Sequence, residues 1–140
     1  MIFKLGGLRE TTLRCPGIGL EVYFQGCSKR CVGCHNPELQ DHSGGSDFDT
    51  ELLLRMIKKS NIYDSLIFLG GEPLEQIEAV RELMNSRYTY NILYTGWEYE
   101  KIPEDIKHGM YMIVSGPYIE ELTTNDFPAS MNQKVTYRER

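Results

Sequence analysis

Apolar and polar residues alternate along the chain in blocks that predict strands and helices in turn. Short runs rich in apolar, β-branched and aromatic residues predict strands over residues 20–26, 65–69, 90–96, 110–116 and 134–137. Apolar residues at helical spacing predict helices over residues 50–59, from Pro73 to about Met84, and over residues 103–107. Strands and helices in this order are typical of parallel βαβ units with right-handed crossovers.

These elements indicate an α/β fold: a small, open partial (βα) barrel of about five mostly parallel strands with flanking helices. So few strands cannot close an eight-stranded barrel, so we expect one side of the sheet to stay open to a macromolecular substrate. The chain has 140 residues, which suits one unit at about 100 to 200 residues per domain. Residues 1–140 are therefore expected to form a single domain.

The ends of the predicted strands carry the residues best placed for chemistry. In parallel sheets, reactive loops lie beyond the carboxyl ends of the strands. Four predicted strands stop at or next to Cys27, Gly70, Gly96 and Gly116, so we expect these residues to meet at one rim. The stretch 117–133 has mixed polarity and no clear period, so its pattern leaves its structure open.

Composition and charge narrow the classes of partner. Fifteen basic against twenty acidic residues give a net charge of −5, which provides no field to attract the phosphates of a nucleic acid. The apolar runs are too short to cross a bilayer, and the first residues carry charges where a signal peptide needs an apolar core. We therefore expect a cytoplasmic protein without membrane association. Cysteines stay reduced there, so the four cysteines suggest metal binding or chemistry before disulfides.

Three cysteines lie together in the segment CSKRCVGC. Cys27, Cys31 and Cys34 have the spacing C-x3-C-x2-C, which gathers three thiolates around one centre. A structural zinc ion needs a fourth ligand; His35 follows Cys34 too closely, whereas His42 could reach. A four-iron cluster held by three cysteines instead leaves one iron open for a substrate or cofactor. The spacing favours the cluster, and zinc remains the alternative.

This spacing resembles that of the radical S-adenosylmethionine (SAM) enzymes. The resemblance implies one 4Fe-4S cluster on Cys27, Cys31 and Cys34, with the amino and carboxylate groups of SAM on the fourth iron. Gly70-Gly71-Glu72-Pro73 resembles the family's GGEP motif for the methionyl ammonium, although alone it is also a plain turn from strand to helix. Glycines allow backbone carbonyls to approach a ligand, and Glu72 supplies a negative group.

The segment CVGCHNPELQ and the small size resemble the activating proteins of anaerobic (class III) ribonucleotide reductase. That resemblance implies an activase that reductively cleaves SAM and abstracts a hydrogen from a glycine of the reductase. It implies two partners, the glycyl-radical subunit and a one-electron donor such as flavodoxin or ferredoxin. No catalytic side chain beyond the cluster and cofactor is implied, and Gly33, Cys34 and His35 take the positions that the family packs against adenine.

Two other functions fit the same residues. A radical SAM enzyme acting on a small molecule would have the same motifs, with residues 117–133 as a lid. A non-catalytic zinc module would use the three cysteines and His42. Three positions also differ from the activase pattern, Cys15, Ser115 and Ala129. We expect Cys15 to be a small, partly buried residue.

Overall fold

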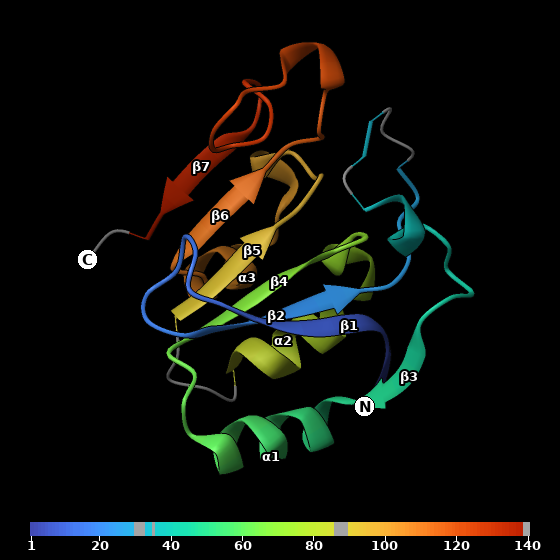
Figure 1. Ribbon diagram of the computed structural model, residues 1–140, viewed down its shortest axis with the longest axis vertical. Helices are drawn as coiled ribbons and strands as arrows, with labels where there is room; N and C mark the ends of the chain where they lie inside the picture. Colours follow the sequence, from blue (N-terminus) through green and yellow to red (C-terminus); the bar gives the residue numbers. More distant parts are fainter. Residues whose placement is uncertain (30–32, 35, 86–89, 139–140) are drawn as a thin grey trace.

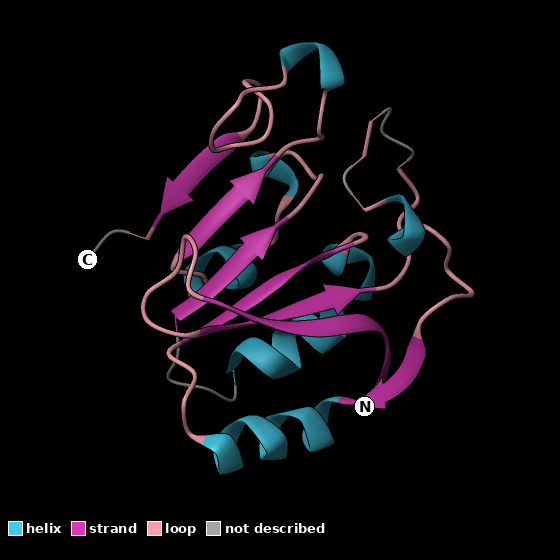
Figure 2. Cartoon of the chain, in the orientation of Figure 1, coloured by secondary structure: helices cyan, strands magenta, loops and turns pink. Residues whose placement is uncertain are grey.

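One sheet of seven strands organises the computed structural model, which describes residues 1–29, 33–34, 36–85 and 90–138 (Figures 1 and 2). Its strands in chain order are β1 (Ile2–Thr11), β2 (Gly19–Phe24), β3 (Ser46–Asp49), β4 (Ser65–Gly70), β5 (Tyr90–Tyr94), β6 (Met112–Ser115) and β7 (Lys134–Tyr137). The α-helices are α1 (Thr50–Ser60), α2 (Ile77–Asn85) and α3 (Glu104–Gly109). Four short 3-10 helices are η1 (Pro37–Leu39), η2 (Pro73–Gln76), η3 (Tyr99–Lys101) and η4 (Glu120–Leu122).

The strands lie in the order β3-β1-β2-β4-β5-β6-β7. Neighbours from β2 to β6 are parallel, whereas β1 and β7 are antiparallel to the strands beside them. Because β3 is antiparallel to β1, it shares the direction of the central four, so five of the seven strands run the same way. The predicted α/β class, an open and mostly parallel partial barrel, is confirmed.

The predicted number of about five strands was too low, because the sequence pattern did not predict β1 and β3. The glycine pair Gly6-Gly7 interrupts the apolar alternation of β1, and the pairing with β2 shifts register between Leu5 and Gly7. Strand β3, SDFD, has a single apolar residue, Phe48, and is a strand because it pairs with β1. A strand that depends on pairing with a segment far away in the sequence need not have a local pattern of apolar residues that predicts it.

The predicted helices are found with small changes at their ends. Helix α1 begins where expected, because the Asp49 side chain accepts a hydrogen bond from the backbone N–H of Glu51 at 3.0 Å. The helix expected from Pro73 starts as η2 and becomes α-helical only at Ile77. The described residues contain no helix with the length and apolar character that crossing a membrane requires.

The two faces of the sheet are covered differently. Helices α1 and α2 pack on one face (Figure 1), where they form the main core with the buried side chains of the central strands. The opposite face carries a smaller apolar cluster of Ile67, Ile92, Met112 and Val114, against which loop residues pack. This second face therefore keeps room for a cavity.

Truncation of a central core residue tests this division. We expect Leu93→Ala, in a side chain that is 0% exposed on β5, to lower the free energy of unfolding by about 2 to 5 kcal/mol through lost burial and a cavity. Leu52→Ala on α1, where the leucine is 41% exposed, should change it by less than about 0.5 kcal/mol. Urea titration followed by circular dichroism measures both; equal losses would contradict the assigned core.

Candidate functional site

The strand ends converge as the sequence predicted. Cys27, Gly70, Gly96 and Gly116 all line one cavity of about 550 Å³. In Figure 1 the carboxyl ends of β2, β5 and β6 point to the side of the molecule where the cysteine loop and the segment after β6 lie. A cavity of this size falls in the range of pockets for small cofactors.

The glycine pair at the end of β4 brings two sequence motifs into contact. A Cβ on Gly70 would collide with the carbonyl oxygen of Phe24, and one on Gly71 would collide with that of Gly26. The backbone N–H of Glu72 donates a hydrogen bond to the Gly26 carbonyl at 2.8 Å. The Gly-Gly-Glu-Pro turn therefore lies directly against the residue before Cys27, and only glycine allows that approach.

Glu72 is buried at the bottom of this junction, with 1% of its surface exposed. Its Oε2 accepts hydrogen bonds from the Leu74 N–H at 3.0 Å and the Thr95 hydroxyl at 2.7 Å, and its Oε1 accepts from the Gly96 N–H at 2.7 Å. Burial raises the pKa of the Glu72 carboxyl, although these three bonds favour the charged form. Glu72 lines the cavity and ties the end of β4 to the end of β5.

Two of the three predicted cluster ligands can be placed. Cys27 and Cys34 are half-buried and line the same cavity. Cys31 and His35 lie outside the described residues. Thiol groups beside an open space of this volume suit an iron-sulfur cluster, whose usual protein ligands are cysteine thiolates. Gly33, with a φ of 75°, lies against the Glu120 carboxyl group and not among the described residues that line the cavity.

His42, the fourth zinc ligand that the sequence left open, instead bonds to Glu75. Its Nε2 lies 3.0 Å from Oε1 of Glu75, and Glu75 also accepts hydrogen bonds from the N–H and hydroxyl of Ser28 at 2.8 and 3.0 Å. Burial opposes ionisation of Glu75, yet the bonds from His42 and Ser28 outweigh it and lower the pKa of this carboxyl. Glu75, which the sequence analysis missed, fastens the cysteine loop to η2. Within the described part of the chain, His42 does not share the cavity lining with Cys27 and Cys34.

The segment 117–133 forms a wall of the cavity. The Arg14 guanidinium lies 4.7 Å from the centre of the Phe127 ring and 3.4 Å from Asp126, which joins this segment to the loop before β2. Burial raises the pKa of Tyr94, beneath Phe127 on the open face, to about 12. Cys15 is half-buried in the same apolar cluster, as expected.

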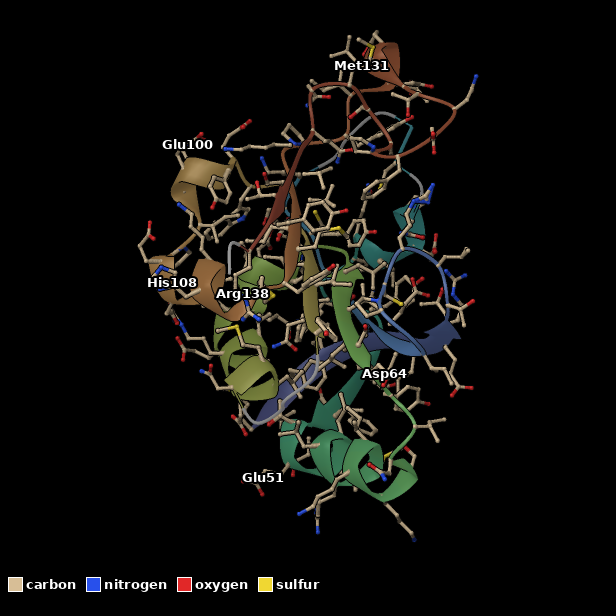
Figure 3. The ribbon with its side chains drawn as sticks, turned by 90° about the vertical axis from the view of Figure 1, so that its left-hand side faces the viewer. Glu51, Asp64, Glu100, His108, Met131 and Arg138 are labelled. Atoms are coloured by element: carbon tan, nitrogen blue, oxygen red, sulfur yellow. The ribbon has the colours of Figure 1, made fainter. Side chains whose placement is uncertain are left out.

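Figure 3 places the tip of this wall relative to the rest of the molecule. Met131 lies at one end of the view and Glu51 of α1 at the other. The cavity wall and the helix layer are therefore distinct parts of the molecule.

Known proteins resemble the chain over most of its length. Residues 13–136 match the family described as the 4Fe-4S single cluster domain. The pyruvate formate-lyase-activating enzyme of Clostridium pasteurianum is 30% identical over 115 residues, which are 76% of this chain and 48% of that enzyme. The pyruvate formate-lyase 1-activating enzyme of Escherichia coli is 33% identical over 76 residues, which are 51% of this chain and 31% of that enzyme. The chain thus spans less than half the length of either relative.

A solved structure has the same kind of fold. QueE from Escherichia coli superposes with a TM-score of 0.53 over 69% of this chain and 53% of its own, at 15% sequence identity. An identity this low shows likeness of fold alone. The match over residues 13–136 covers most of the chain, including Cys27 and Cys34. The chain therefore belongs to the 4Fe-4S single cluster domain family and is homologous to the pyruvate formate-lyase activating enzymes.

Proposed function

We propose that this protein is a radical SAM activase for a glycyl-radical enzyme, and that its target is anaerobic ribonucleotide reductase. The observation that carries the proposal is the meeting of the cysteine loop and the Gly70–Glu72 turn at one cavity, because a cluster and SAM must bind side by side. The named relatives support activation of a glycyl-radical enzyme. The segment CVGCHNPELQ favours the reductase as the target.

The cofactors would supply the radical chemistry when bound. A donor such as flavodoxin or ferredoxin would provide one electron for the cleavage of one SAM. The products would be methionine and 5′-deoxyadenosine, and the latter would carry the hydrogen atom that the target glycine loses. The thiolates of Cys27, Cys31 and Cys34 would hold the single 4Fe-4S cluster. Half-burial of Cys27 and Cys34 limits the access of water to it. We also propose that residues 1–140 act as one domain in the cytosol.

Residues around the cavity would bind and orient SAM. The backbone of Gly70 and Gly71 is available at the rim, and the Glu72 carboxyl group behind it would favour a positive ammonium. Cys34 and His35 would lie along the adenine. Gly33, which lies against Glu120 and not in the cavity lining, would form the turn beside them. Since Glu72 also bonds to Thr95 and Gly96, it would position the rim as well as contribute charge.

The function is tested by radical transfer. Protein loaded with iron and sulfide without oxygen, then reduced, should convert SAM to 5′-deoxyadenosine and give a glycyl doublet in electron paramagnetic resonance when anaerobic ribonucleotide reductase is present. Pyruvate formate-lyase is the parallel sample, and no target protein is the control. A doublet only on pyruvate formate-lyase would overturn the target, and failure to cleave SAM would overturn the activase.

The ligand set is tested by two matched variants. We expect Cys34→Ala to lose the brown colour of the loaded protein, because removal of one of three thiolates leaves the cluster without enough ligands. His42→Ala should keep the colour, because His42 bonds to Glu75 outside the cavity lining. Iron analysis and the visible spectrum measure both. If the wild-type protein is colourless and contains zinc, and His42→Ala no longer binds that zinc, the protein is a zinc module instead.

The Glu72 carboxylate should strengthen SAM binding. We expect Glu72→Gln to raise the Kd for SAM about tenfold, because a hydrogen bond with a charged partner contributes about 1.5 to 3 kcal/mol. Glu78→Gln, at an exposed glutamate of α2 that pairs with Arg81, is the control. Calorimetry of SAM binding to loaded protein measures both, with thermal melts to monitor folding. An unchanged Kd would limit Glu72 to holding the strand ends together.

A further inference from the structure

An ion pair lies in the cavity on the open face of the sheet. Arg9 on β1 and Glu21 on β2 are directly opposite each other in the antiparallel register, and both line the cavity. The Arg9 Nε donates a hydrogen bond to Oε1 of Glu21 at 2.6 Å, and the Tyr23 hydroxyl donates to the same oxygen at 3.2 Å. Neither the cysteine motif nor the Gly-Gly-Glu-Pro turn accounts for this group.

Glu21 is buried, with 8% of its surface exposed, yet only one of its oxygens is used within the protein. Among the described residues, no donor reaches its Oε2. Among the side chains that the structure describes, Thr136 Oγ1 is the one buried polar atom without a partner, so Oε2 of Glu21 is accessible and can accept a hydrogen bond from a ligand or water in the cavity. The Arg9 side chain is 68% exposed and bonds to Glu21 through Nε, which leaves its Nη1 and Nη2 groups to donate elsewhere.

The pair therefore presents an acceptor and donors side by side. A ligand with a carboxylate alone would be repelled by Glu21, and one with an ammonium alone would be repelled by Arg9. A peptide group is neutral and offers one N–H and one C=O, which match Oε2 of Glu21 and the Nη groups of Arg9. The neighbouring side chains Tyr94 and Phe127 add apolar surface for the rest of a chain segment.

The position of the pair separates it from the proposed SAM site. Glu21 is in register with Ile67, whereas the strand ends meet where Phe24 is in register with Gly70. Three residues of strand place Glu21 about 10 Å back from that rim. Sugar hydroxyls of a cofactor could also donate and accept, but the cofactor motifs lie at the rim and not at this depth.

We propose that Glu21 and Arg9 bind a backbone peptide group of the target chain, in the segment that carries the glycine to be activated. This rests on the proposed function and deepens it: the residues would help to position the glycine segment across the open face of the sheet. Tyr23 would hold the Glu21 carboxylate in place through its hydroxyl.

The test is a binding experiment on protein loaded with cluster and SAM under anaerobic conditions. The probe is an acetylated and amidated synthetic peptide that spans the radical glycine of anaerobic ribonucleotide reductase. We expect Glu21→Gln to raise the Kd of the peptide about tenfold, because the amide nitrogen replaces an acceptor with a donor. The Kd for SAM should change by less than about twofold.

Glu10→Gln is the matched control. Glu10 is a neighbour of Arg9 on β1, is exposed, and accepts a hydrogen bond from the Tyr63 hydroxyl outside the cavity. It should leave the peptide Kd unchanged. A series of peptides, each with one N-methylated amide, identifies the peptide group that is bound. Methylation at one position should raise the peptide Kd of the wild type about tenfold. The same methylation should not raise the peptide Kd of Glu21→Gln any further.

Each outcome decides the inference. A peptide that does not bind the wild type, an unchanged peptide Kd in Glu21→Gln, or an equal loss in Glu10→Gln would overturn it. Weaker SAM binding in Glu21→Gln with an unchanged peptide Kd would assign the pair to the cofactor sugar instead. Failure of the proposed function is seen separately, since SAM cleavage and the glycyl doublet are measured without these variants.

Discussion

The close approach of the ends of β2 and β4 is the constraint on which the site depends. Gly70 and Gly71 leave space for the carbonyls of Phe24 and Gly26, and the Glu72 N–H bonds to Gly26. The buried Glu72 carboxyl then bonds to the first residues after β5. Three strand ends are thereby held around one cavity before any ligand binds, which is the kind of preorganisation that a cofactor site requires.

One face of the sheet carries most of the hydrophobic core, and the other face carries the cavity. Helices cover one face and bury most of the large apolar side chains, so the free energy of folding comes mainly from there. The other face has fewer apolar residues, carries the Arg9–Glu21 pair and is partly covered by residues 117–133. Because loops rather than helices cover this face, it can hold polar groups beside a cavity.

Local patterns predicted the elements whose own residues specify them. Helix α1 follows from Asp49 as its cap and from an apolar stripe, and the central strands follow from continuous apolar runs. Strands β1 and β3 were missed because their existence depends on pairing with each other and with β2. The role of Glu75 was also hidden, because it joins η2 to Ser28 and His42, far away in the sequence.

The amino-acid sequence by itself determined the chemistry available: three thiols at close spacing, a glycine pair before a glutamate, and strands that stop at these residues. Their spacing is local, so it can be read without a fold. Only the tertiary structure decided that Arg9 and Glu21 form a pair, that His42 turns to Glu75, and that residues 117–133 wall the cavity. These contacts arise from strand register and loop packing between distant segments, which no short stretch of sequence encodes.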